Sequence, residues 1–368
     1  MVSSLTEIVD QKQPSITEWL EQAGITNVAE LREEDNNKRD RLEILYQTLG
    51  IQYDRPTKLS ARDIADRSKN FLDVLRTQGK EKCALRLVPI KAGLPKLRVR
   101  GKTLIENLKW FAGLGINPDD YKAEIIPHCD NTAYSAIFVI NDSGIWGEIA
   151  PGAHWQLTQG LYNQPPIVFR YDFLDWFFSS TNTTVINIIK KAINLLRVAK
   201  EKQGTLKDSL SSEFTKQDYL KGYFEFVVWP EIGISFIDYN RILYKMVGEF
   251  PPLTQVAKED VLSGINASPG KTNGKIKIVI DPTQIAFENG EILVCLMTTI
   301  DYLPLMRKAA GIITEQGNIL SHAAIISREL KKPCLVGVKN AMKLLKNGQE
   351  VELDANAGVI RVIENCKL

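Results

Sequence analysis

The C-terminal stretch from residue 261 to 364 alternates short apolar runs with a few helical segments. This pattern restricts the fold more than any other feature of the 368-residue chain. Runs rich in Val, Ile and Leu predict strands at 274–280, 291–297, 311–314, 334–338, 350–354 and 359–363. Helical spacing predicts helices at 301–309, 321–330 and near 341–345. Strands interleaved with so few helices indicate a compact β/α domain.

The residues before this stretch divide into a helical part and a mixed part. Residues 15–77 are expected to be helical, with one charged helix over 27–49. Ser60 and Asp63 resemble a capping box that opens a further helix. Beyond them, we expect strands at 83–90, 96–100, 133–140, 145–148 and within 222–238, and a helix at 184–202. A proline pair at 251–252 marks a linker. We therefore predict three domains, at 1–79, 80–250 and 261–364, and an α/β fold class.

Composition and charge exclude several classes of protein. The chain has 46 Lys and Arg against 44 Asp and Glu, and its net charge of +2 gives no sign of a nucleic-acid or membrane partner. No apolar run approaches the ~18–20 residues that span a bilayer. The N-terminus lacks the basic and apolar segments of a signal peptide, so we expect a cytoplasmic protein. The 5 cysteines include no CxxC pair, which supports neither a disulfide framework nor a zinc ribbon.

His322, one of only 3 histidines, lies in the most informative segment of the sequence. A buried strand at 311–314 leads through a Gly-containing loop to Ser321, a good N-cap, and His322 follows in the first helical turn. The positive end of the helix dipole favours a neutral, nucleophilic imidazole, and the free N–H groups there can receive a phosphate. Arg328 is placed to neutralise phosphate charge. The pattern predicts an imidazole that carries a phosphoryl group, with a structural first-turn histidine as the alternative.

The same residues resemble a known family. The run Thr314-x-x-Gly317-x-x-x-Ser321-His322, followed by Arg328, is similar to the phosphohistidine signature of phosphoenolpyruvate-utilising enzymes. This family includes phosphoenolpyruvate synthase, pyruvate phosphate dikinase and rifampin phosphotransferase. The likeness extends co-linearly over about 100 residues, through the segments 264–274, 298–309, 333–337 and 354–358. It implies a swivelling β/β/α domain at 261–364 that moves phospho-His322 between two active sites, with catalytic roles for Ser321, Arg328 and Thr314.

One residue of the signature departs from the family's pattern. Asn318 stands where these enzymes usually have a second glycine. Asparagine tolerates a positive φ angle better than most residues, so we expect the loop to keep its shape.

The resemblance also implies a donor site for the phosphoryl group. In this family an ATP-grasp domain loads the histidine, and residues 80–250 are similar to such a domain at three places. Ala84-Leu-Arg86 resembles the strand whose arginine contacts ATP phosphates, and Gly147-Glu148 resembles a segment late in that fold. Glu225 and Asp238 resemble the final hairpin, where an acidic residue and an amide hold Mg²⁺ and nucleotide. The resemblance thus implies that Arg86, Glu148, Glu225 and Asp238 bind ATP, and that Glu225 and Asp238 bind Mg²⁺.

This second resemblance has departures. The Ser-Ser and acidic residues expected after Arg86 are missing, and the first 80 residues lack the family's Gly-Lys opening. Asp238 stands where the amide is expected only after a one-residue shift. Residues 80–109 carry nine Lys and Arg against two Glu, a local charge of +7 suited to a polyphosphate. The alternative is a solvated basic face, with Glu225 and Asp238 as exposed strand residues.

Two further histidines and the basic run also have interpretations without a functional role. His154 lies in a Gly-flanked loop soon after Glu148 and belongs either to a nucleotide or acceptor site or to a structural loop. His128 lacks further ligands at metal spacing and is expected to be structural. Binding of nucleic acid through 80–109 is disfavoured, because only Trp110 and Phe111 adjoin the basic run.

Two hypotheses about function follow. The first is a phosphotransferase that passes a phosphoryl group from ATP through His322 to an unidentified small-molecule or protein acceptor. The chain ends at Leu368, soon after the last expected strand, so we expect no pyruvate-binding (β/α)₈ barrel and no synthesis of phosphoenolpyruvate by this polypeptide alone. The second is a non-catalytic phosphocarrier or regulatory protein with a degenerate nucleotide-binding region. The sequence leaves the acceptor, the ADP or AMP product and the oligomeric state open.

Overall fold

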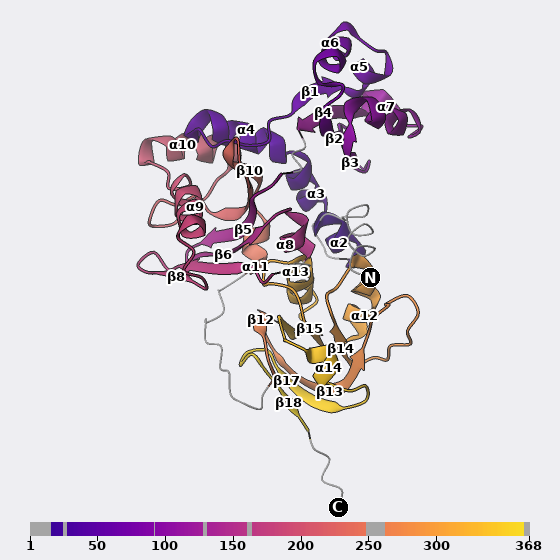
Figure 1. Cartoon of the computed structure of the whole chain (residues 1–368), viewed down its shortest axis with the longest axis vertical. Helices are drawn as coiled ribbons and strands as arrows, with labels where there is room; N and C mark the ends of the chain where they lie inside the picture. Colours follow the sequence, from indigo (N-terminus) through magenta and orange to yellow (C-terminus); the bar gives the residue numbers. More distant parts are fainter. Residues whose placement is uncertain are drawn as a thin grey trace, which may run out of the picture.

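Three β-sheets organise the chain. The computed structural model describes residues 16–24, 28–91, 93–127, 131–159, 164–247 and 262–363. We call the parts around the three sheets the first lobe (57–127), the central lobe (131–247) and the C-terminal lobe (262–363). Figure 1 shows the first lobe at the top, the central lobe on the left and the C-terminal lobe at the bottom. The α/β fold class is confirmed, with antiparallel sheets before a mixed one.

Helices precede the first lobe, whose sheet is antiparallel with the order β1-β4-β2-β3. The leading helices are α2 (Ile16–Gln22), α3 (Val28–Asn36) and α4 (Lys38–Leu49). The strands are β1 (Thr57–Ser60), β2 (Lys82–Pro89), β3 (Leu97–Thr103) and β4 (Tyr121–Pro127). The helices of the lobe are α5 (Ala61–Ala65), α6 (Lys69–Gln78), α7 (Leu104–Ala112) and the 3₁₀ turn η1 (Pro118–Asp120). The capping box of Ser60 and Asp63 is confirmed. The single helix expected over 27–49 is instead broken at Asn37, one of two adjacent asparagines of low helix propensity.

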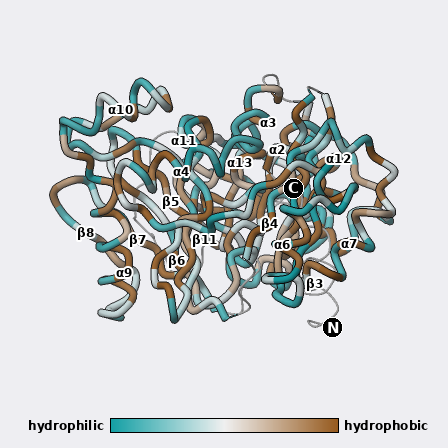
Figure 2. Tube along the Cα trace, turned by 90° about the horizontal axis from the view of Figure 1, so that it is seen from above, coloured by the Kyte–Doolittle hydropathy of each residue, from teal (hydrophilic) through white to brown (hydrophobic). Residues whose placement is uncertain are grey.

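The central lobe holds an antiparallel sheet with the order β10-β9-β5-β6-β7-β8. Its strands are β5 (Tyr134–Asn141), β6 (Gly144–Pro151), β7 (Ile167–Tyr171), β8 (Trp176–Phe178), β9 (Gly222–Trp229) and β10 (Gly233–Asn240). Its helices are α8 (Trp155–Gln159), α9 (Thr183–Asn194), α10 (Lys200–Leu210) and α11 (Leu243–Val247). Figure 2 shows a largely hydrophobic chain around β5, β6 and β7 and a mostly hydrophilic α10 at the edge.

The two faces of this sheet pack against different partners. Side chains alternate along β5, so that Phe138 joins the core formed with α4, α9 and α10. Ile137 and Val139 point the other way, into a core shared with the C-terminal lobe. The helix expected over 184–202 ends at Asn194, because residues 196–198 hydrogen-bond to the backbone of residues 218–220 instead. Tertiary pairing thus overrides local helix periodicity there.

The C-terminal lobe forms a mixed sheet with the order β11-β18-β17-β13-β14-β15-β16-β12, in which β13 to β16 are parallel. Its strands are β11 (Leu262–Ser263), β12 (Ile265–Ser268), β13 (Lys271–Ile278), β14 (Ile292–Cys295), β15 (Gly311–Thr314), β16 (Cys334–Val336), β17 (Glu350–Asp354) and β18 (Val359–Val362). Its helices are the 3₁₀ turn η2 (Ile300–Tyr302), α12 (Leu303–Lys308), α13 (His322–Glu329) and α14 (Ala341–Leu344). All the strands and helices expected from the sequence of this lobe are confirmed, with small shifts of their ends.

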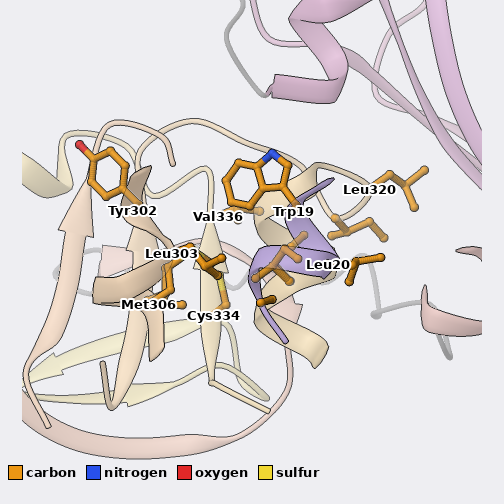
Figure 3. Packing of buried hydrophobic residues seen from close by; sticks show 14 of the residues in the cluster. Trp19, Leu20, Tyr302, Leu303, Met306, Leu320, Cys334 and Val336 are labelled. Atoms are coloured by element: carbon orange, nitrogen blue, oxygen red, sulfur yellow. The ribbon is translucent and has the colours of Figure 1, made fainter. Parts of the chain in front are cut away.

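The central and C-terminal lobes meet through a continuous apolar core. Helix α13 contacts α2, α8 and α11, which places it against the face of the central sheet opposite α9. Trp19 and Leu20 of α2 are fully buried in this core. Figure 3 shows these two side chains close to Leu303, Met306 and Leu320 of the C-terminal lobe. The described ranges contain no helix with the length and apolar character needed to cross a bilayer. The domain limits at 1–79, 80–250 and 261–364 stay a prediction, and β1 pairs with β4 across the first of them.

The buried indole of Trp19 generates a prediction about docking. Trp19→Ala removes a fully buried side chain from the core between α2 and the C-terminal lobe, at a cost of about 3–5 kcal/mol. We therefore expect this variant to populate an undocked form, measured as a larger radius of gyration in small-angle X-ray scattering. Trp176→Ala is the matched control, because Trp176 stacks on Tyr171 in the central sheet. Equal dimensions for Trp19→Ala and the wild type would contradict this role.

Candidate functional site

A cavity of about 410 Å³ lies where the three lobes meet. It is lined by strands of the first and central lobes, by α4 and by α13. Four of the residues predicted from the sequence line it together: Arg86, Glu225, Asp238 and His322. The structure does not place the other four, Thr314, Ser321, Arg328 and Glu148, among the lining residues. Residues from segments more than two hundred positions apart in the sequence thus share one cavity.

His322 is the first residue of α13, as the sequence predicts. Ser321 is the N-cap: its hydroxyl accepts a hydrogen bond from the N–H of Ala324 and donates one to the carbonyl of Asn318 at 2.8 Å. The Nδ1 atom of His322 is buried without a hydrogen-bond partner. The rings of His322 and Trp19 are in an edge-to-face arrangement, with their centroids 6.0 Å apart. The cap therefore fixes the backbone, and Trp19 confines the imidazole.

Burial lowers the pKa of His322 to about 4. The carboxylate of Glu225 opposes this shift, whereas His154 and Arg98 add to it. The imidazole is therefore neutral at pH 7 and keeps a free electron pair, as nucleophilic attack requires.

Arg328 and Thr314 lie behind His322. The guanidinium of Arg328 donates to the carbonyls of Ala267 at 2.6 Å and Ile319 at 2.7 Å, so it holds the loop before α13 against β12. The Oγ1 atom of Thr314, at the end of β15, is buried without a partner. A side chain on Gly317, whose φ is 126°, would lie 3.4 Å from that atom. Arg328 thus shapes the loop, and its role toward phosphate stays a prediction.

Glu225 and Asp238 form a pair of carboxylates on adjacent strands. They are direct partners in the β9–β10 ladder because a bulge at Ile237 adds one residue to β10. The predicted match at Asp238 needs a one-residue shift, and the bulge adds one residue at this place in β10. Without it, the alternation of side chains after Phe236 would place residue 238 on the helix-covered face. Both carboxylates are buried, which excludes the alternative of exposed strand residues.

The two carboxylates have pKa values shifted in opposite directions. Burial alone would raise the pKa of Glu225, but His154, Lys38 and the hydroxyl of Tyr223 lower it to about 2. The Tyr223 hydroxyl donates to Oε1 at 2.8 Å, and Nε2 of His154 lies 3.1 Å from Oε2. Burial raises the pKa of Asp238 and outweighs Lys38, whose Nζ lies 3.3 Å from Oδ2. Glu225 is thus the firmly ionised member, and Oδ1 of Asp238 is buried without a partner.

Helix α4 covers the edge of β10 with basic side chains. Arg39 donates to the carbonyl of Ile237 at 2.7 Å and pairs with Asp54, and Arg41 donates to the carbonyl of Tyr239 at 3.0 Å. Lys38, which precedes Arg39, reaches Asp238. These contacts satisfy carbonyls that an edge strand leaves unpaired, and they hold the bulge in place.

The opposite wall of the cavity is basic. Arg86 of β2 faces it with Arg98 and Arg100 of β3, beside Lys38 and Arg39 of α4. Burial, together with the nearby charge of Arg39, lowers the pKa of Arg86 to about 10, and its Nη1 atom is buried without a partner. Buried cationic donors around a cavity favour a polyanion such as a polyphosphate. The residues from the 80–109 run that line the cavity therefore do not form a solvated face.

Glu148 lies in the same row of the central sheet as Glu225, with Ile137 of β5 between them. Its side chain is buried, and burial raises its pKa well above the ordinary value. Its Oε2 atom has no partner. Nucleotide binding by Glu148 stays a prediction, because this carboxyl does not line the cavity.

Sequence reasoning missed the contribution of α3 and α4. Asp35, Lys38, Arg39 and Asp54 all line the cavity, although residues 1–79 were expected to be a separate helical region. The sequence offers only a weak signal, a run of charges at 38 to 41 beside the apolar Leu42, and the structure buries Arg39 and Arg41 with Leu42. His154 also lines the cavity, which favours the first of its two interpretations. His128 and the linker at 251–252 lie outside the described residues.

The donor set of the cavity fits Mg²⁺. The described part of the chain has no group of three or more His, Cys, Asp and Glu that would hold a metal by itself. Mg²⁺ is commonly held by one or two carboxylates together with substrate phosphates. Glu225, Asp238 and the unpaired Oδ1 of Asp238 beside a basic wall match that arrangement.

Comparison with known proteins defines the C-terminal lobe. Residues 287–358 match the family described as PEP-utilising enzyme, mobile domain. The C-terminal part of the chain is a PEP-utilising enzyme mobile domain. A probable phosphoenolpyruvate synthase of Methanothermobacter thermautotrophicus is 44% identical over 120 residues, which are 31% of this chain and 17% of the relative. The uncharacterized phosphotransferase YvkC of Bacillus subtilis is 41% identical over 106 residues, 28% of this chain and 13% of the relative.

The remainder of the chain has more distant likenesses. The D-alanine-D-alanine ligase from Coxiella burnetii resembles 55% of this chain, over 47% of its own length, with 13% identity and a TM-score of 0.30. The chain therefore shares a mobile domain with its curated relatives and spans only a small part of their length.

The lowered pKa of His322 gives a measurable pH dependence. The unfolded chain takes up a proton near the ordinary value of 6.5, whereas the folded protein keeps the mobile domain's imidazole neutral down to about 4. The contribution of neutral His322 is complete above pH 6.5 and is lost as the pH falls toward about 4. We expect its ring resonance in NMR spectra, assigned by comparison with His322→Ala, to titrate near 4. A midpoint near 6.5 would contradict the burial of this ring.

Proposed function

We propose that this protein is a phosphotransferase that moves a phosphoryl group from ATP to His322 and from there to an acceptor. One observation carries the proposal: His322 of the mobile domain lines the same cavity as Glu225, Asp238 and Arg86. A phosphocarrier histidine is useful at such a place only if a phosphoryl donor binds there. The neutral state of the imidazole at pH 7 supports its role as the attacking group.

The transfer is a displacement at phosphorus. An imidazole nitrogen of His322 attacks a phosphorus atom of ATP, the new N–P bond forms, and the bond to the leaving phosphate oxygen breaks. The leaving group is ADP if the γ phosphorus is attacked. If the β phosphorus is attacked, AMP leaves and His322 carries a pyrophosphoryl group, and water then releases its terminal phosphate as inorganic phosphate to leave phospho-His322. In the second half-reaction, a nucleophile of the acceptor takes the phosphoryl group and restores neutral His322.

Different residues of the cavity would bind the phosphates and the metal ion. Arg86, with Arg98 and Arg100, would bind the phosphate oxygens and stabilise charge that builds up in the transition state. Glu225 and Asp238 would hold Mg²⁺, which when bound neutralises phosphate charge. The packing of α13 on the central lobe shields part of His322 from water, which limits hydrolysis.

The acceptor is a small molecule or another protein that His322 meets after the mobile domain leaves this cavity. The names of the relatives support phosphoryl transfer in general, and the reaction belongs where ATP is available, in the cytoplasm.

His322→Ala tests the carrier role directly. We expect full loss of label from the protein after incubation with Mg²⁺ and ATP labelled at the β or γ position, while circular dichroism stays that of the wild type. In the wild type, mass spectrometry at neutral pH should find an acid-labile phosphoryl adduct on His322, and the label retained identifies the phosphorus that moved. Labelling of the variant at the wild-type level would overturn the proposal, and a folded, unlabelled wild type would favour the non-catalytic carrier.

Glu225→Gln tests the carboxylate pair. The change keeps the size of the side chain and removes the charge that the pair offers to Mg²⁺, so we expect the affinity for Mn²⁺ with a non-hydrolysable ATP analogue to fall by about 100-fold. Glu231→Gln is the matched control, because Glu231 is exposed at the turn of the same hairpin. Equal affinities for the two variants, measured by electron paramagnetic resonance, would remove Glu225 from the binding site.

A further inference from the structure

Helix α8 lies between the loop that precedes His322 and the carboxylate pair of Glu225 and Asp238. It follows β6 in the central lobe, where it packs on β5 and β6, and it contacts α13 of the mobile domain. Figure 1 shows α8 between the central sheet and α13. Two residues that the sequence left unexplained meet this helix: His154 directly precedes its first residue, and Asn318 bonds to Leu157 at its middle.

Asn318 is bonded across the lobes. Its Nδ2 donates to the carbonyl of Leu157 on α8 at 3.1 Å, and its Oδ1 accepts from the N–H of Leu320 at 2.9 Å. The side chain is 1% exposed. Asn318 does not adopt a positive φ, which falls on Gly317 instead, so tolerance of that conformation is not the reason for asparagine here. A glycine could provide the loop's shape but not the bond to α8.

His154 lies immediately before α8 and reaches Glu225. Its Nε2 lies at ion-pair distance, 3.1 Å, from Oε2 of Glu225 without the geometry of a hydrogen bond, and the other oxygen of that carboxylate accepts from Tyr223. Both oxygens of Glu225 are thus approached by side chains of the central lobe. A polar neighbour of this kind fixes the rotamer of a carboxylate that binds a metal or a nucleotide.

We propose that α8 couples the docking of the mobile domain to the arrangement of Glu225. When the domain docks, Asn318 binds the carbonyl of Leu157 and fixes α8, and α8 then holds His154 against Glu225. His154 and Asn318 are positioning residues, since neither is required to touch the transferred phosphoryl group. Glu225 is therefore arranged to bind the donor nucleotide only while His322 is in the cavity to receive the phosphoryl group. This inference rests on the proposed phosphotransfer.

A double-mutant cycle tests the coupling. His154→Ala removes the contact with Glu225. Asn318→Ser gives a side chain too short to bond to the carbonyl of Leu157, while it keeps an oxygen near the N–H of Leu320. We expect each single change to weaken binding of Mn²⁺ with AMP-PNP by about 10-fold, and the double variant to bind no more weakly than either single variant.

Two further variants serve as controls. His154→Gln keeps a donor of similar reach and should restore most of the affinity lost in His154→Ala. Gln156→Ala changes another polar side chain of α8 and should leave the affinity as in the wild type. Additive losses in the double variant, or wild-type affinity in His154→Ala, would overturn the coupling.

A measurement without metal or nucleotide separates this inference from the proposed function. Asn318→Ser should increase the modification of His154 by diethyl pyrocarbonate severalfold, read by peptide mass spectrometry, because α8 is released. Unchanged modification would overturn the coupling even in a protein that transfers phosphate. A protein that shows the coupling but never labels His322 from ATP would keep this inference about α8 and lose the phosphotransferase.

Discussion

The contact between α4 and the edge of β10 is the interaction on which the site depends. An edge strand presents carbonyls that need partners, and here Arg39 and Arg41 provide them at residues 237 and 239. Because these two arginines are bound on either side of it, Asp238 is held in the cavity beside Lys38. One buried helix face thus stabilises the edge of the sheet and places a carboxylate. The cost of burying so many charges is offset by hydrogen bonds to the backbone and by ion pairs.

Burial sets the protonation states of the groups that face the cavity. It favours the neutral form of His322, and it raises the pKa of Asp238 while neighbouring groups keep Glu225 ionised. One environment thus shifts the pKa values of neighbouring titratable groups in different directions. The burial that keeps His322 neutral depends on docking of the mobile domain, since α13 packs against α2, α8 and α11.

Local signals predicted the C-terminal lobe well. The strand at 311–314, the cap at Ser321 and the helix after it need only neighbouring residues, and each is present as expected. The helix at 184–202 could not be predicted correctly, because its break is caused by pairing with residues 218–220. The site was predicted in part: Arg86, Glu225, Asp238 and His322 converge, whereas Lys38 and Arg39 were missed. Their role depends on a contact between α4 and β10, about two hundred residues away, that no local pattern contains.

The bulge at Ile237 has a consequence for the comparison of related sequences. Because the extra residue reverses the alternation of β10, Ile237 and Asp238 both face the cavity, and Tyr239 returns to the helix-covered core. Homologues that lack this insertion would need their acidic residue one position earlier to present it to the same cavity. Alignments of this hairpin that ignore an inserted position would therefore match the cavity-lining carboxylate of one protein to a core side chain of another.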